Sequence, residues 1–139
     1  MRPETSTQII GPITIDGLFN PIITFQAATA TQAVSQRIFT APYGCRIASV
    51  GVAYLTAATD SDAVTLQIHV PTAGGAPNTG TAVLAAPLTL KTGANTLVYP
   101  VPLIATPPNI AEGGAIAVVF AGVVTGLTGL NVTIKLERL

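Results

Sequence analysis

Apolar and polar side chains alternate strictly in two segments of the chain, residues 63–70 and residues 130–136. Successive side chains of a β-strand point to opposite faces, so a period of two predicts a strand with one buried face. The two predicted buried faces consist of Val64, Leu66, Ile68 and Val70 in the first segment and of Leu130, Val132, Ile134 and Leu136 in the second. Both segments are therefore expected to line the core of a β-sheet protein.

Six further segments predict strands with a less regular pattern. Segment 46–55 carries apolar residues on both faces, and segment 115–121 has the composition of a strand that is covered on both sides. The remaining predicted strands are 25–28, 32–40, 83–91 and 96–101. The chain also has 13 glycines and 11 prolines, which interrupt these β-branched runs and leave little room for a helix. The expected fold is all-β, a β-sandwich with jelly-roll-like connections.

Residues 1–21 differ from the rest and predict an extended N-terminal arm in front of a β-sandwich domain that spans residues 22–139. The breakers that disfavour an independent helix in the arm are Pro3, Gly11, Pro12, Gly17 and Pro21. Apolar side chains of the arm still need cover, because fully burying each one is worth roughly 1.5–3 kcal/mol. We therefore predict that the arm packs against a neighbouring subunit or another partner surface through Ile9, Ile10, Ile13, Ile15, Leu18 and Phe19.

The composition indicates a large protein interface. Hydrophobic residues make up 49% of the chain and charged residues only 9%, against roughly 25% in typical soluble proteins. Such a composition favours either a membrane or an extensive contact with other proteins. The most apolar stretch, 113–124, contains three glycines and is shorter than the roughly 20 residues that a membrane-spanning helix needs. An obligate oligomer is the better explanation, and no membrane association is expected.

The distribution of charge argues against a nucleic-acid partner, and the start of the chain and the single cysteine indicate the cellular compartment. Six basic and six acidic residues give a net charge of zero, and the basic residues are scattered, whereas a nucleic-acid-binding protein would cluster them. We therefore expect no nucleic-acid partner. The start of the chain has no apolar run of the signal-peptide kind, and the single Cys45 rules out a disulfide within the chain. Both observations fit synthesis and assembly in a cytoplasm.

No catalytic apparatus or cofactor site is predicted. His69, the single histidine, lies on the polar face of a predicted strand, and neither a zinc cluster nor a nucleophile–base pair can be built around it. Asp60 and Asp62 could contribute oxygens to a calcium site, but a solvated turn is the better interpretation. The seven aromatic residues, which include Tyr43, Tyr54 and Tyr99, can all be part of the core. The protein is expected not to be an enzyme.

The stretch from Thr40 to the end carries a set of turn and strand motifs. They are 41–46 (APYGCR), 57–66 (AATDSDAVTL), 79–84 (TGTAVL), 92–96 (TGANT), 120–122 (FAG) and 127–134 (LTGLNVTI). In these motifs the chain resembles the head decoration, or cement, proteins of tailed bacteriophages. The resemblance implies a jelly-roll-like sandwich that sits as a homotrimer on the outer surface of the capsid. It also implies that the partner is the major capsid protein and that the arm serves for anchoring.

Two other functions compete with capsid decoration as interpretations of the sequence. A receptor- or glycan-binding knob of a head fibre or tail would be favoured by exposed aromatic or acidic clusters at the loop tips, and the sequence shows none. A jelly-roll hydrolase would need paired carboxylates or a metal triad, and six scattered acidic residues with one histidine do not supply them. The expected function is therefore structural, as a virion protein that stabilises the capsid lattice.

Overall fold

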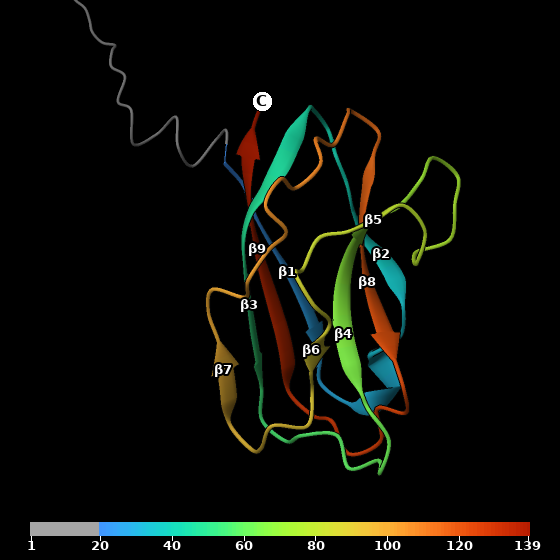
Figure 1. Ribbon diagram of the computed structural model, residues 1–139, viewed down its shortest axis with the longest axis vertical. Helices are drawn as coiled ribbons and strands as arrows, with labels where there is room; N and C mark the ends of the chain where they lie inside the picture. The colour runs from blue at the N-terminus through green and yellow to red at the C-terminus, as the bar shows by residue number, and fades with distance from the viewer. Residues whose placement is uncertain (1–19) are drawn as a thin grey trace, which may run out of the picture.

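The computed structural model describes residues 20–139 and shows two antiparallel sheets that pack face to face (Figure 1). Sheet A has the order β1 (Ile22–Ala27), β9 (Leu130–Arg138), β3 (Cys45–Tyr54) and β7 (Thr96–Val98). Sheet B has the order β2 (Gln36–Thr40), β8 (Ala115–Ala121), β4 (Thr65–Val70) and β5 (Thr81–Ala82), and β6 (Leu88–Thr89) pairs with the other end of β4.

The strand pairing is that of a jelly roll. Strand β5 and strand β6 lie on the same edge of β4, so together they form one interrupted strand. With these two counted as one, the first strand pairs with the last (β1 with β9), the second with the second last (β2 with β8) and the third with the third last (β3 with β7). A long nested hairpin that is rolled into two sheets has this pattern. The structure thus confirms the predicted all-β sandwich with jelly-roll-like topology.

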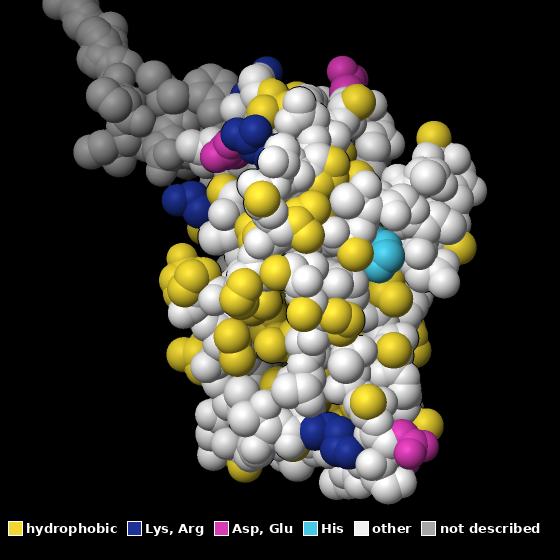
Figure 2. All heavy atoms as spheres, viewed as in Figure 1, with side chains coloured by type: hydrophobic (Ala, Val, Ile, Leu, Met, Phe, Trp, Pro, Cys, Tyr) yellow, Lys and Arg dark blue, Asp and Glu magenta, His cyan; other side chains and the backbone are white. Residues whose placement is uncertain are grey.

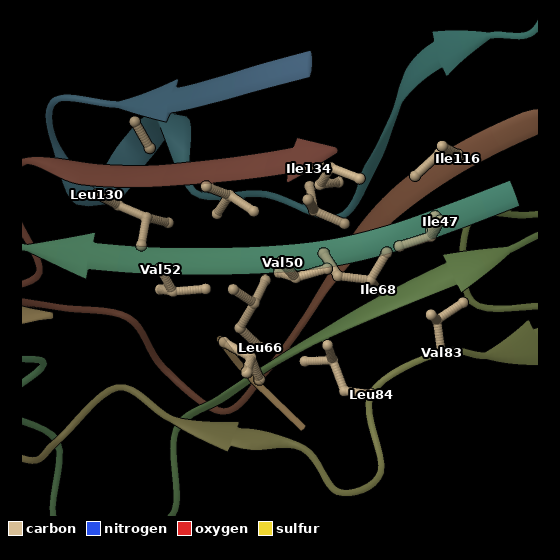
Figure 3. Packing of buried hydrophobic residues seen from close by; sticks show 14 of the residues in the cluster. Ile47, Val50, Val52, Leu66, Ile68, Val83, Leu84, Ile116, Leu130 and Ile134 are labelled. Atoms are coloured by element: carbon tan, nitrogen blue, oxygen red, sulfur yellow. The ribbon is translucent and has the colours of Figure 1, made fainter. Parts of the chain in front are cut away.

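The core lies between the two sheets and matches the predicted alternation (Figure 3). In β9 the four predicted inward side chains are at most 1% exposed. From sheet B, Leu66 and Ile68 of β4 and Ile116 and Val118 of β8 are completely buried against them. Val70, at the end of β4, is only partly buried. A period of two thus located the inward faces correctly wherever strands run undisturbed through the centre of a sheet.

A β-bulge explains why segment 46–55 has apolar residues at both odd and even positions. The register between β3 and β9 shifts between Ile47 and Ser49. A bulge places one extra residue in one strand and so changes which side of the sheet the following side chains face. Ile47 before the shift and Val50 and Val52 after it are therefore all buried in the same core.

Two predicted strands are shorter in the structure than the sequence predicted. Segment 83–91 contains only the two-residue strand β6, because Pro87 has no N–H to donate to a ladder. Segment 32–40 becomes a strand only at Gln36, because a 3-10 turn at Ala30–Gln32 precedes it. The side chain of Gln32 stabilises that turn, since its Oε1 accepts the backbone N–H of Ala28 at 2.8 Å.

Strand β8 is covered on both faces only in part: on its outward side Ala117 is buried, whereas Ala121 is exposed. Its inward residues belong to the core, and Ala117 on its outward side is also completely buried. Ala117 pairs with Arg37 on β2 and with His69 on β4. Both of these side chains bond to the loop 71–80, Arg37 to the carbonyl oxygen of Gly75 and His69 through Nδ1 to the carbonyl oxygen of Thr79 at 3.1 Å. This loop therefore lies over the outward face of sheet B.

Candidate interaction surface

The chain enters the described structure at the end of sheet A. The side chain of Asn20 accepts the backbone N–H of Arg138 at 3.2 Å, and the carbonyl oxygen of Pro21 accepts the N–H of Leu136 at 2.9 Å. Both bonds tie the root of the predicted arm to the C-terminal end of β9. The predicted interface residues Ile9, Ile10, Ile13, Ile15, Leu18 and Phe19 lie outside the described residues, as does all of the predicted arm except its last two positions.

The outward face of sheet A carries large apolar side chains that face solvent. Leu97 on β7 is 73% exposed, Tyr99 directly after β7 is 68% exposed, and Leu55 directly after β3 is 55% exposed. Strand register places Leu97 beside Ala53 of β3, and Ala53 beside Asn131 of β9. Leu97, Ala53 and Asn131 therefore form a row across the sheet, and none of the three is charged.

Gly51 lets the ring of Tyr99 lie against this face. A Cβ atom at position 51 would come within 2.9 Å of Cδ1 of Tyr99, which is closer than such atoms pack. The backbone of Gly51 is buried although it lies on the outward side of its strand. One face of the tyrosine ring thus covers the sheet, while most of the side chain remains open to solvent.

Two hollows adjoin these side chains. The first hollow has a volume of about 250 Å³ and is lined by Gly51, Val52, Ala53, Leu97, Tyr99, Asn131 and Thr133. The second hollow has a volume of about 300 Å³ and is lined by Ala53, Tyr54, Leu55, Asn95, Thr96, Leu97 and Gly129. Ala53 and Leu97 line both, so the two hollows are neighbours on one face. We refer to them together as the sheet A hollows.

No charged side chain among residues 20–139 lines the sheet A hollows, and the nearest along β9 is the exposed Lys135, two residues after Thr133 on the same face. In the view of Figure 2, hydrophobic side chains gather over β7 and the segment after it, whereas charged side chains lie toward the two ends of the long axis. Arg46 and Glu137 form an ion pair at one end. At the other end, Nζ of Lys91 donates to the carbonyl oxygen of Asp62 at 2.8 Å. The charged side chains in these two clusters are therefore separate from the sheet A hollows, whose lining residues are uncharged.

The structure keeps His69 apart from the two candidate metal-binding aspartates. Asp60 and Asp62 lie in the loop before β4, where Oδ2 of Asp60 accepts the N–H of Asp62 at 3.2 Å, and His69 lies near the far end of β4. Within residues 20–139 no three His, Cys, Asp or Glu side chains are grouped so that they could hold a metal ion. Cys45 is completely buried, and this burial raises the pKa of its thiol.

A separate cleft of about 390 Å³ lies between the loop 71–74 and the segment 111–115. Arg37 and Glu112 line it, so its character is polar and charged. The guanidinium of Arg37 already bonds to the carbonyl oxygen of Gly75. This cleft therefore differs in chemistry from the apolar sheet A hollows.

Sequence analysis missed the exposed residues of sheet A. It allowed all aromatic residues to be core, which is right for Tyr54, 2% exposed with its hydroxyl bonded to the N–H of Thr92, but wrong for Tyr99. Parity in the predicted strand shows only that Leu97 and Tyr99 share one face. The pairing of β7 with β3 and the exposure of both side chains show that this face lies opposite the core.

Comparisons with known proteins give few similarities. No protein-family model matches the chain, and no curated protein matches it. Among solved structures, the capsid asymmetric unit of cyanophage Pam1 is similar with 16% identity over 100% of both chains and a TM-score of 0.48. A pilus protein of Bacillus endospore appendages is similar with 15% identity, over 86% of this chain and 87% of that chain, with a TM-score of 0.37. At TM-scores below 0.5, neither likeness establishes a function.

No helix within residues 20–139 is long and apolar enough to span a membrane.

Proposed function

We propose that this protein is a structural virion protein that binds the outer surface of a phage capsid as a homotrimer and stabilises the lattice of major capsid proteins. The observation that carries the proposal is the exposed apolar part of the outward face of sheet A, where Leu97 and Tyr99 lie beside two hollows lined by uncharged residues. Soluble monomers seldom expose contiguous apolar surface of this kind, and larger patches mark sites of protein contact.

The fold is consistent with this role. Double-sheet jelly rolls are common in viral capsid proteins and in lectins, so the architecture favours surface recognition over a particular chemistry. The sequence motifs from Thr40 onward resemble phage decoration proteins, and they fall on the turns and strands of this jelly roll. In the proposed function the protein is not an enzyme and needs no cofactor.

A decoration protein stabilises a capsid lattice because its binding is coupled to the assembly of that lattice. A protein that binds only the assembled, expanded shell shifts the equilibrium toward that shell by mass action. Each bound trimer would bridge neighbouring capsid subunits, and its contacts would have to break before those subunits separate. The neutral surface suits this task because burying unpaired charge in such contacts would oppose binding.

Cryo-electron microscopy of the phage that encodes this chain tests the proposal. We expect density for the jelly roll in trimers on the outside of the capsid. Capsids that lack the protein should regain it when the purified chain is added, and they should then disassemble at a higher temperature. Density at a tail or head fibre, or capsids whose melting the protein does not change, would contradict the proposal.

One observation favours a second candidate function, a glycan-binding module. Tyr99 presents an exposed ring beside the side chains of Asn131 and Thr133 in the first hollow. Sugars stack on aromatic rings and bond to amide and hydroxyl groups, and jelly rolls include lectins. Titration with a panel of host-surface glycans, using Tyr99→Ala as the matched variant, tests this function. Saturable binding that the variant loses would support it.

A further inference from the structure

We propose that the N-terminal segment 1–19 of one copy lies in the sheet A hollows of a neighbouring copy, with Ile13 and Ile15 as its anchors. This inference rests on the proposed function in one respect, the homotrimer. It assigns the exposed apolar part of sheet A to contact between copies within the trimer that decorates the capsid.

The hollows have the right chemistry and spacing for two isoleucines. Their lining is apolar or neutral, and Leu97 stands between them as a shared wall. Residues 51–53 line the first hollow and residues 53–55 line the second, so the two linings are offset by two residues along this segment of the chain. Two residues of an extended strand span about 6.7 Å. Ile13 and Ile15 are also two residues apart, so an extended segment would present both on one face at that spacing.

The segment outside the described structure has a suitable length and composition. Nineteen extended residues reach at most about 63 Å, which is ample for a neighbouring molecule. From residue 9 onward the segment carries six large apolar side chains. Its charged residues are Arg2, Glu4 and Asp16. The alternation in Ile13-Thr14-Ile15 matches a strand with one apolar face. A neutral surface and a weakly charged apolar segment are complementary.

The direction of the chain favours a neighbouring copy over the same copy. The hollows lie beside Asn131 and Thr133, which pair with Gln26 and Thr24 of β1, downstream of the point where the arm joins the sheet. At Pro21 the backbone still follows β9 toward its C-terminal end. A chain that continues in this direction moves away from its own hollows, whereas it moves toward a molecule packed at that end.

Cysteine cross-linking tests the proposal on the full-length chain. A tagged chain with Ile15→Cys is co-expressed with an untagged chain with Leu97→Cys, and tagged–untagged disulfide dimers are measured on a non-reducing gel. In the matched control, Val123→Cys replaces Leu97→Cys, because Val123 is also exposed (56%) but lies in the turn after β8. We expect at least tenfold more mixed dimer with Leu97→Cys. Native Cys45 should not take part, since it is buried and its pKa is raised.

Three outcomes would overturn the inference. They are equal yields for the two positions, no mixed dimer at all, or a double variant with Ile15→Cys and Leu97→Cys in one chain that forms only a bond within that chain. A second measurement is independent of cysteine chemistry. Light scattering should show that Leu97→Asp loses the trimer while Val123→Asp keeps it, and identical behaviour of the two variants would also overturn the inference.

The failure of this inference is distinguishable from the failure of the proposed function. Cross-linking is measured in solution without capsids, and capsid binding is measured with the wild-type protein. Selective cross-linking without capsid binding would leave the arm contact standing and refute decoration. Capsid binding without selective cross-linking would leave decoration standing and refute the arm contact.

Discussion

Truncation of Ile134 tests the jelly-roll core in a quantitative way. Ile134 lies at the centre of β9, between Ile23 of β1 and Val50 of β3, and it is completely buried. Ile134→Ala removes three buried carbons, which are worth about 2.4 kcal/mol at roughly 0.8 kcal/mol each. The space left between the two sheets adds a further cost, because packed neighbours relax only partly. We expect the free energy of unfolding to fall by about 3–4 kcal/mol.

The matched variants set the scale. Ile134→Val removes one carbon and should cost about 1 kcal/mol. Thr133→Ala changes the adjacent residue, whose side chain faces outward and is exposed, so the cost should stay within roughly 0.5 kcal/mol. For a domain of this size, the Ile134→Ala change corresponds to a fall in Tm on the order of 10–15 °C.

The assay is urea unfolding followed by circular dichroism, at one fixed protein concentration because self-association shifts apparent stability. The slope of the transition should be the same in all variants, so that the midpoints report stability alone. A cost below 1 kcal/mol for Ile134→Ala, or an equal cost for Thr133→Ala, would refute the assignment of the inward face of β9 and with it the register of sheet A.

Three further predictions concern the surface. Deletion of residues 1–19 should leave the Tm of the jelly roll nearly unchanged but weaken self-association by roughly 10²–10⁴-fold, which corresponds to the free energy of burying two isoleucines. Sedimentation at several protein concentrations measures the self-association, and a deletion variant that does not fold would refute the prediction. Gly51→Ala should push the ring of Tyr99 off the sheet and weaken the trimer, while the melting temperature changes little because alanine suits a strand better than glycine; an unchanged trimer would contradict the role of this ring. Alanine at Asp60, Asp62 or His69 should each cost no more than roughly 0.5 kcal/mol in thermal or urea unfolding, and a loss of several kcal/mol at any of them would show that it has a structural role.

The sequence alone determined most of the strand-forming segments and the core face of those that run straight. Alternation in β4 and β9 reflects a local rule, since a strand must bury one face and can solvate the other. The same rule predicted that β8 is covered on both sides, which holds for part of the strand, and the density of glycine and proline predicted the all-β class. No pairing partner needs to be known for any of these inferences.

Only the tertiary structure decided where apolar side chains meet on the outside. The bulge in β3, the short pieces β5 and β6, and the placement of Tyr99 over Gly51 all depend on strands that are far apart in the sequence. Leu97, Ala53 and Asn131 form one row because three distant segments pair in one register. Alternation within a segment records that a face is buried or exposed, but it contains no information about which strand lies beside it. The sheet A hollows are therefore a property of the fold, whereas the isoleucines proposed to fill them could be identified in the sequence.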